Sequence, residues 1–275
     1  MFMTRISRSL IRLKTFLNFL FRVISYGSFS SLKNYSIIYY RGAKIFFINS
    51  NRILRYRINS FKTKEPETLK WIESFDKKTS FWDIGSNIGE FAIFASKIKN
   101  CDVVAFEPSF ANLNTLAKNI YINNVQDKVS IFPIALNEKN KIGMLKSSNL
   151  NPGHATSSFV NGLGNDGKPI KVNFEYRTLS FSLDKVIEEF CLKEPDYIKI
   201  DVDGNEHLVL SGAQKTLKKV KEILIELPGD WREQTEISHK ILKDSGFTQI
   251  KKHNFDRLTN PNVSANEIWS RTKNS

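Results

Sequence analysis

Residues 81–95, which read FWDIGSNIGEFAIFA, decide the fold of this 275-residue chain. A short apolar run ends near the acid Asp83, a turn with two glycines follows, and the apolar residues after the turn recur at helical spacing. This order of strand, glycine turn and helix is typical of the first unit of a nucleotide-binding α/β sheet. Gly85 and Gly89 let the backbone pass close to a ligand, and the helix N-terminus beyond them favours a carboxylate.

The turn differs from a dinucleotide site in the residues that it lacks. A pyrophosphate site needs G-x-G-x-x-G, whereas the middle position here is Asn87, and Asp83 would repel a phosphate but accept hydrogen bonds from an ammonium group. A second acid, Glu107, follows the apolar run 103–106, where a carboxylate that binds a ribose diol is expected. An amino acid joined to a nucleoside describes S-adenosylmethionine, the cofactor that we predict. The alternative is an ordinary βαβ unit whose glycines only make the turn.

Positive charge is concentrated at the N-terminus of the chain. Residues 1–64 contain 13 Lys or Arg and no acid, so the formal net charge of +13 belongs to them, and residues 65–275 are neutral. A neutral catalytic region argues against an enzyme that holds nucleic acid with positive charge. We predict two parts, a basic N-terminal segment of residues 1–64 and an α/β domain of residues 65–275.

Residues 1–26 have the pattern of an amphipathic basic helix. Apolar residues recur there at spacings of three and four, and Arg5, Arg8, Arg12 and Arg22 largely avoid that stripe. Such a helix either lies on an anionic membrane surface or packs on protein, including a second copy in a homodimer. The charges interrupt the segment too often for a membrane span or a signal peptide.

The remaining pattern predicts a mostly parallel sheet with helices on both faces, because strands and helices alternate. The expected strands are 80–84, 102–107, 129–134, 197–201, 222–226, 247–253 and 266–271, and the expected helices are 64–75, the run after Gly89, 110–122, 183–190, 206–217 and 233–246. Residues 36–58 predict two or three short strands, the last over 53–56, with a turn near Arg41. Residues 137–180 break the alternation and predict extended pieces around a loop at 149–168. The two cysteines, Cys101 and Cys191, form no metal or disulfide pattern, so a reducing, cytoplasmic compartment is expected, with possible peripheral contact at the inner face of the membrane.

A second group of acids follows the fourth strand of the expected sheet. Residues 198–206 read IKIDVDGNE, and Asp201 stands at the carboxyl end of the strand, where open α/β sheets place their ligands. Asp203 and Glu206 follow within one turn, and carboxylates this close repel one another unless a proton, cation or basic group intervenes. We expect an active-site role for Asp201. The alternative for the acids after it is a helix start with acids at its positive end.

The two motifs together resemble the FkbM family of S-adenosylmethionine-dependent methyltransferases. The matching segments are 83–89, 106–108, 134–136, 183–184, 199–206 with Leu210 and Gly212, and 225–226. Ser86 and Asp203 depart mildly from the family's usual D-x-G-A-N-x-G and D-x-E-G-x-E. Residues 1–64 lie outside the resemblance. The resemblance implies a Rossmann-like class I methyltransferase fold with a seven-stranded sheet, and O-methylation of a saccharide or small-molecule acceptor.

The resemblance also implies roles for individual residues. Asp83, Gly85, Asn87 and Gly89 would line the methionine end of the cofactor, Glu107 would hold the ribose and Ala135 would meet the adenine. Candidates for the base that takes the acceptor's proton are foremost Asp201, Glu206 and His207, followed by Glu226 and His154. No metal is expected, because Glu226 is followed by Leu227 rather than by an amide.

Three other functions remain as alternatives. A nucleic-acid methyltransferase is disfavoured because no Asn/Asp-Pro-Pro-aromatic clamp follows the fourth strand. A nicotinamide-dependent oxidoreductase is disfavoured by Asn87 and Asp83. The third alternative is a membrane-associated binding module that kept the fold without the chemistry.

Overall fold

A computed structural model describes residues 34–155, 157–159, 161–164, 166–229, 231–254 and 264–272. The helix expected over residues 1–26 lies outside these residues. None of the helices in the described part of the chain combines the length and the apolar composition that crossing a bilayer requires.

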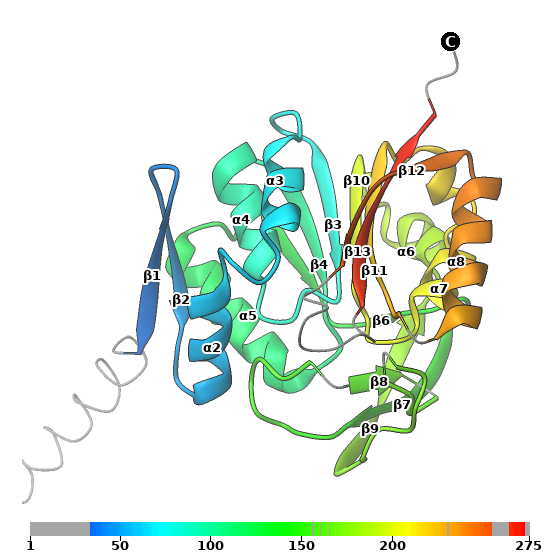
Figure 1. The fold of residues 1–275 in the computed structure, drawn as a ribbon. Coiled ribbons are helices and arrows are strands. Elements are labelled where there is room, and N and C mark those ends of the chain that lie inside the picture. The colour runs from blue at the N-terminus through cyan, green and yellow to red at the C-terminus, as the bar shows by residue number, and fades with distance from the viewer. Residues whose placement is uncertain are drawn as a thin grey trace, which may run out of the picture.

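A seven-stranded sheet in the order β12-β13-β11-β10-β3-β4-β5 forms the centre of the molecule (Figure 1). All pairs are parallel except those of β13, which runs antiparallel to both β11 and β12. The strands are β3 (Ser80–Ile84), β4 (Asp102–Phe106), β5 (Val129–Phe132), β10 (Tyr197–Ile200), β11 (Glu222–Leu227), β12 (Phe247–Asn254) and β13 (Ala265–Arg271). The predicted mostly parallel, seven-stranded sheet is confirmed, including its two C-terminal strands.

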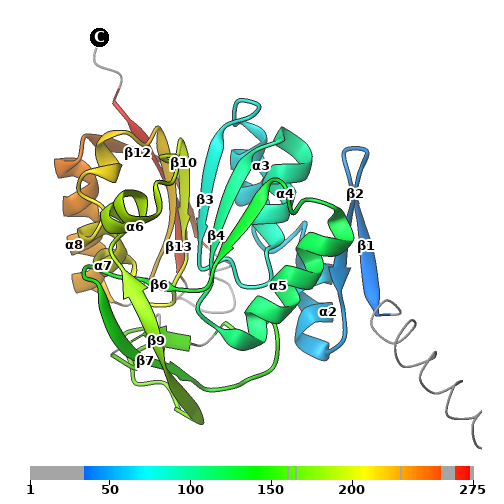
Figure 2. The ribbon, with the colours of Figure 1, turned by 180° about the vertical axis from the view of Figure 1, so that it is seen from behind.

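Helices cover both faces of this sheet, as predicted, and Figure 2 shows the face opposite to that of Figure 1. The helices α3 (Pro66–Glu73), α4 (Glu90–Lys99) and α5 (Phe110–Asn123) cover one face, and α6 (Leu183–Phe190), α7 (Glu206–Ser211) and α8 (Arg232–Asp244) cover the other. Successive strand residues point to opposite faces, so Phe81 packs in the first core and Trp82 in the second. Both residues are fully buried, which is why the run around Asp83 is apolar on both sides.

An N-terminal hairpin of β1 (Tyr35–Tyr40) and β2 (Ala43–Ile48) packs beside α5 and turns at Arg41, as expected. Side chains of α5 bind the edge of β2: Asn123 Oδ1 accepts from the amide of Phe46 at 3.0 Å, and Asn119 Oδ1 accepts from that of Ile48 at 2.8 Å. Apolar side chains of the hairpin belong to the same core as those of α3 and α4. The described part of the basic segment therefore shares a core with the α/β domain.

The strand expected over residues 53–56 is wrong, because residues 52–60 form the helix α2 (Arg52–Ser60). Asn51 caps it by accepting from the amide of Leu54 at 2.8 Å. Leu54 and Ile58 are buried four residues apart, so the segment follows a helical period despite its β-branched and aromatic composition.

The helix expected over 206–217 is also shorter than predicted. The helix α7 ends at Ser211, and a separate 3-10 turn follows over Thr216–Lys218. Gly212 follows α7 and packs closely against another segment, because a Cβ there would overlap the carbonyl oxygen of Asn137.

The irregular region 137–180 forms a second sheet in the order β6-β9-β7-β8, which lies beyond one end of the main sheet (Figure 1). Its strands are β6 (Ala135–Leu136), β7 (Lys141–Ser147), β8 (Ser157–Phe159) and β9 (Phe174–Phe181). The strands β7 and β9 confirm the predicted extended pieces, β8 lies within the segment expected as a loop, and β6 comes just before residue 137. Ala135, Leu145 and Phe159 form a small buried cluster there.

Candidate active site

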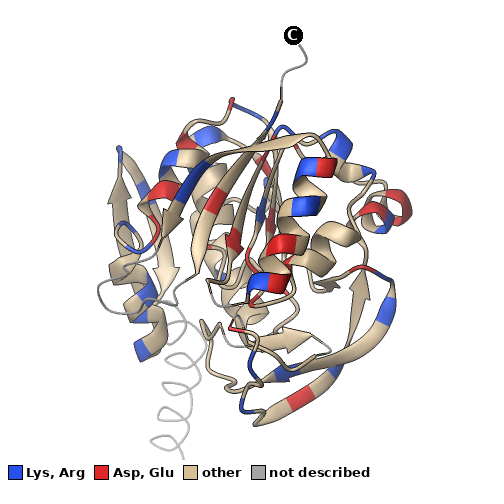
Figure 3. Ribbon diagram, turned by 45° about the vertical axis from the view of Figure 1, so that its right-hand side comes forward, with Lys and Arg blue, Asp and Glu red and all other residues tan. Residues whose placement is uncertain are grey.

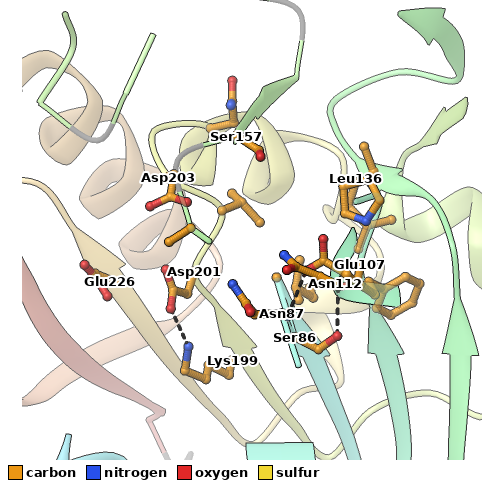
Figure 4. Close-up of a pocket in the computed structure, with 18 of the residues that line it drawn as sticks. Ser86, Asn87, Glu107, Asn112, Leu136, Ser157, Lys199, Asp201, Asp203 and Glu226 are labelled. Atoms are coloured by element: carbon orange, nitrogen blue, oxygen red, sulfur yellow. Dashed lines mark hydrogen bonds and ion pairs between the residues drawn. The ribbon is translucent and has the colours of Figure 1, made fainter. Parts of the chain in front are cut away.

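The carboxyl ends of three parallel strands meet at one edge of the sheet. Asp83 of β3 lies directly beside Ala105 of β4 and Lys199 of β10. A cavity of about 270 Å³ opens at this edge, and Figure 4 shows the side chains that point into it. Its lining includes Arg57, Lys64, Glu65, Gly85, Ser86, Asn87, Glu90, Phe91, Glu107, Asn112, Ala135, Leu136, His154, Ser157, Phe159, Lys199, Asp201, Asp203 and Glu226.

The turn after β3 has no room for side chains at its glycines. Gly85 has a φ of +82°, and a Cβ there would overlap the carbonyl oxygen of Asp201. The amides of Gly85 and Ser86 both donate to the carbonyl oxygen of Phe106 at 3.0 Å, which ties the turn to the end of β4. Glycine at position 85 is therefore required by the close packing of the turn against the backbone of Asp201, and Gly85 also lines the cavity.

Asn87 joins this turn to the neighbouring segments. It adopts a left-handed φ of +50°, its amide donates to Glu107 Oε2 at 2.8 Å, and its Nδ2 donates to the carbonyl oxygen of His154 at 3.2 Å. Its Oδ1 is buried and has no partner among the described residues. A buried acceptor that faces a cavity without a partner fits a donor on a ligand, such as the ammonium group of S-adenosylmethionine.

Glu107 lies close to Asn112, at the end of the cavity away from Asp201 and Glu226 (Figure 4). Its Oε1 accepts from the amide of Ser109 at 2.8 Å, and its Oε2 is bound by Asn87. Burial raises the pKa of Glu107 to about 7, although these hydrogen bonds and that of Asn112 lower it. Each oxygen keeps a second lone pair, so the carboxylate is able to accept from a ribose diol, and the contact with the ribose stays a prediction. Ala135 also lines the cavity, and its contact with the adenine stays a prediction.

Asp83 is placed differently from Glu107. It is 1% exposed, both its oxygens lack partners within the described residues, and it is not among the residues that line the cavity. Burial raises its pKa to about 7, while the charge of Lys199 lowers it. Gly89 also lies outside the described lining and packs against Leu116. Direct contact of these two residues with the cofactor stays a prediction.

Asp201 forms a buried ion pair at the centre of the site. Lys199 Nζ lies 2.8 Å from Asp201 Oδ2, and the Lys199 side chain is 1% exposed. The ammonium also lies 5.0 Å from the ring centroid of Phe91. Burial raises the pKa of Asp201, but the charges of Lys199, Lys64 and Arg57 outweigh burial and hold it below its usual value. Asp201 is therefore an ionised, engaged carboxylate.

Two further carboxylates accompany Asp201. Oxygens of Glu65, Asp201 and Glu226 lie within 4.8 Å of one another, and Glu65 comes from the chain just before α3. A cation between them would relieve their repulsion, but Lys199 and Lys64 already supply positive charge, the latter 3.2 Å from Glu65. The expectation that no metal is needed stays a prediction.

Glu206 and His207 are not among the described residues that line the cavity. Glu206 accepts from the amides of Val202 at 3.0 Å and Gly204 at 3.2 Å, and from Gln234. It therefore holds the loop that carries Asp201 in place. His207 lies beside Trp231, with ring centroids 5.9 Å apart. Neither side chain reaches the described lining of the cavity, so their roles as bases stay predictions.

The sequence led us to expect that the N-terminal strands and the loop 149–168 shape the acceptor pocket, but it did not identify the residues of the N-terminal segment that line the cavity. Arg57 of α2 donates from Nη1 to Glu90 Oε2 at 2.9 Å and from Nε to the carbonyl oxygen of Gly153 at 2.6 Å. Lys64 and Glu65 also line the cavity. No local pattern marks Arg57 and Lys64, because a basic run without acids is also typical of an exposed surface. Figure 3 shows basic residues on the hairpin and on α2.

The strand order, the glycine turn after β3 and the acid after β4 together define a Rossmann-like, class I methyltransferase fold. The chain belongs to the methyltransferase FkbM domain family, whose model matches residues 83–254. Membership makes the chain a methyltransferase and implies S-adenosylmethionine as its methyl donor. The resemblance inferred from the motifs is confirmed.

Individual relatives are distant. Hexuronic acid methyltransferase AglP from Haloferax volcanii is 25% identical over 175 residues, which cover 62% of this chain and 65% of AglP. The match thus spans just under two thirds of that relative. The solved structure of FkbM from Methylobacillus flagellatus is 16% identical, covering 80% of this chain and 55% of that one, with a TM-score of 0.47. M. jannaschii TYW2 in complex with AdoMet is 12% identical, covering 87% of each chain, also with a TM-score of 0.47.

Proposed function

We propose that this methyltransferase transfers a methyl group to a hydroxyl oxygen of a sugar, either in a glycan or in a secondary metabolite. The observation that carries the proposal is the group of three carboxylates at one end of the cavity, Glu65, Asp201 and Glu226. Carboxylates accept hydrogen bonds strongly, and a sugar ring offers several hydroxyl donors on neighbouring carbons. The distant relative AglP is a hexuronic acid methyltransferase, which supports a sugar acceptor for this chain.

The cavity has two ends with different chemistry (Figure 4). Gly85, Asn87 and Glu107 form the end that would hold the donor, and Asp201 and Glu226 form the end that would hold the acceptor. S-adenosylmethionine, when bound, supplies an electrophilic methyl group on a sulfonium. The residues of the chain supply alignment of the two reactants, which accelerates a bimolecular displacement strongly, and a group that takes the hydroxyl proton.

The charges at the acceptor end disfavour the nucleic-acid alternative. The acids that line the cavity include Glu65, Asp201, Asp203 and Glu226. Basic side chains in the lining, such as Lys199, are already paired with acids. A phosphate backbone is bound by unpaired Lys and Arg and is repelled by carboxylates. A neutral, hydroxyl-rich acceptor fits this environment better.

The test is methyl transfer from S-adenosylmethionine labelled in its methyl group. The full chain is incubated separately with neutral hexoses, hexuronic acids, transfer RNA and no acceptor, and label in each acceptor is counted. We expect transfer to a sugar. The product is then treated with mild alkali, because a methyl ether survives this treatment and a methyl ester does not. Transfer to RNA alone, or ester formation alone, contradicts the proposal.

We further propose that residues 1–26 bring the enzyme to an anionic membrane surface. The support is the absence of any acidic residue before Glu65, which extends the basic pattern through the described hairpin and α2. Each basic residue near such a surface contributes about 1 kcal/mol. Co-sedimentation with phosphatidylserine vesicles should require the anionic lipid, weaken with salt and disappear when residues 1–26 are deleted. Binding that survives the deletion, or loss of a dimer instead, contradicts it.

A further inference from the structure

We propose that Glu226 accepts the proton of the acceptor hydroxyl, and that the Lys199–Asp201 ion pair positions the acceptor and Glu226 for this step. The inference rests on the proposed function. It moves the role of base away from Asp201, where the sequence motif had suggested it.

Glu226 stands near the carboxyl end of β11, where it lines the cavity. Ile225 of β11 pairs in register with Ile200 of β10, so the next residues, Glu226 and Asp201, come side by side at the carboxyl edge. Figure 4 shows both side chains at the same end of the cavity, with Lys199 below Asp201. Glu226 is half-buried, lines the cavity, and has no hydrogen bond or ion pair within the described residues. It is therefore free to bind a proton or a hydroxyl.

Asp201 is already bound to Lys199. Its Oδ2 accepts from Lys199 Nζ at 2.8 Å, and the Lys199 side chain is only 1% exposed. Protonating Asp201 would leave the buried ammonium without its partner, which is costly. A carboxylate that is held ionised in this way binds a substrate hydroxyl well but takes up a proton poorly.

Charged side chains of several neighbouring segments shift the pKa of Glu226. Burial raises its pKa well above the usual range, and the negative charges of Asp201 and Glu65 raise it further, whereas Lys64 and Lys199 lower it. A general base acts best when its pKa lies near the working pH, so this environment suits Glu226 to the role. Glu206 is bound by the amides of Val202 and Gly204 and by Gln234, and His207 packs beside Trp231. Neither is among the described residues that line the cavity.

The acceptor oxygen forms a bond to the methyl carbon while the carbon–sulfur bond breaks and its electron pair stays on sulfur. The hydroxyl proton passes to a carboxylate oxygen of Glu226, which later releases it to water. The products are a methyl ether and a neutral thioether.

The experiment compares Glu226→Gln, Asp201→Asn and the control Glu236→Gln, which changes an exposed glutamate of α8. The rate of methyl transfer to the sugar found above is measured from pH 5 to 9. In wild type the rate should fall at low pH as Glu226 protonates. In Glu226→Gln, kcat should fall about 10²- to 10⁴-fold and this limb should vanish. In Asp201→Asn the limb should persist at lower pH, because a negative charge beside Glu226 is gone, and KM should rise.

A second measurement needs no acceptor. The pKa of Glu226 is raised on folding, so ionising it destabilises the native state as the pH rises. The melting temperature of Glu226→Gln, relative to that of wild type, should therefore increase from pH 5 to pH 8. Glu236→Gln should have the melting temperature of wild type at every pH. Binding of S-adenosylhomocysteine, measured by calorimetry, should be retained in Glu226→Gln.

Three results overturn the inference. The first is a kcat of Glu226→Gln within about threefold of wild type, far below the usual contribution of a general base. The second is an acid limb that disappears in Asp201→Asn and stays in Glu226→Gln, which returns the role to Asp201. The third is a melting difference that does not change with pH. These results can be told apart from a failure of the proposed function, because in that case the wild-type enzyme itself methylates no sugar.

Discussion

The amide of Asn87 donates to Glu107 Oε2 at 2.8 Å and so joins the glycine turn after β3 to the acid after β4. The two signals that suggested S-adenosylmethionine, separated by twenty residues in the sequence, are thus parts of one hydrogen-bonded unit. Glu107 fixes the turn and, with its remaining lone pairs, can bind the ligand that the turn faces.

We expect Glu107→Ala to weaken binding of S-adenosylhomocysteine about 10- to 100-fold, because a hydrogen bond to a charged group contributes about 1.5–3 kcal/mol. Isothermal titration calorimetry measures the change. The control is Glu175→Ala, an exposed glutamate of β9. Equal affinity in Glu107→Ala and wild type would show that the ribose is held elsewhere.

The pair Gly85→Ala and Gly42→Ala separates backbone strain from steric overlap. The two glycines have φ of +82° and +83°, so each alanine costs about 1–2 kcal/mol for the left-handed conformation. Gly42 has nothing within 4 Å of a new Cβ, whereas Gly85 faces the Asp201 carbonyl. Chemical denaturation should therefore show a larger loss for Gly85→Ala, and only this variant should lose cofactor binding. Equal losses would contradict the close packing of the turn.

Asp83→Asn should change the pH dependence of stability. Folding raises the pKa of Asp83 from 3.8 to about 7, so its contribution to stability is lost as the pH rises through that range. The variant removes this loss, so its free energy of unfolding relative to wild type should increase from pH 4 to pH 8, by up to about 4 kcal/mol. Urea denaturation at several pH values measures it, with the exposed Asp102→Asn as control. A difference that stays constant with pH refutes the prediction.

Arg57→Met should loosen the wall that the N-terminal segment adds to the site. Arg57 and Glu90 side chains are 15% and 12% exposed, and breaking a buried pair costs up to about 3–5 kcal/mol. The bond to the Gly153 carbonyl is lost as well, so both thermal stability and affinity for S-adenosylhomocysteine should fall. The control Arg55→Met changes an exposed arginine of the same helix. If both variants behave alike, the segment does not support the site.

Removal of divalent metal should leave methyl transfer unchanged. Lys199 and Lys64 supply the positive charge that the carboxylates at the acceptor end require. The measurement is the transfer rate after treatment with EDTA and after adding magnesium back. A rate that falls with EDTA and recovers with magnesium would place a cation among the carboxylates.

Local sequence pattern determined the sheet and the cofactor end of the site. Strands such as β3 are marked by apolar runs, and the left-handed φ of +82° at Gly85 favours glycine within the turn itself. Asn87 and Glu107 follow strands that end at one edge of a parallel sheet, so their positions along the chain already imply that they meet. The pattern failed at residues 53–56, where composition suggested a strand but the capping by Asn51 and the four-residue spacing of buried side chains give a helix.

Only the tertiary structure decided the acceptor end. Glu65 reaches Asp201 and Glu226 because α3 packs against the main sheet, a contact between segments far apart in the chain. Which carboxylate is held ionised and which is free to take a proton depends on burial and on neighbouring charges such as Lys199, and these arise only when the chain is packed. Sequence motifs name the acids, but the electrostatic environment that separates their roles is a property of the folded molecule.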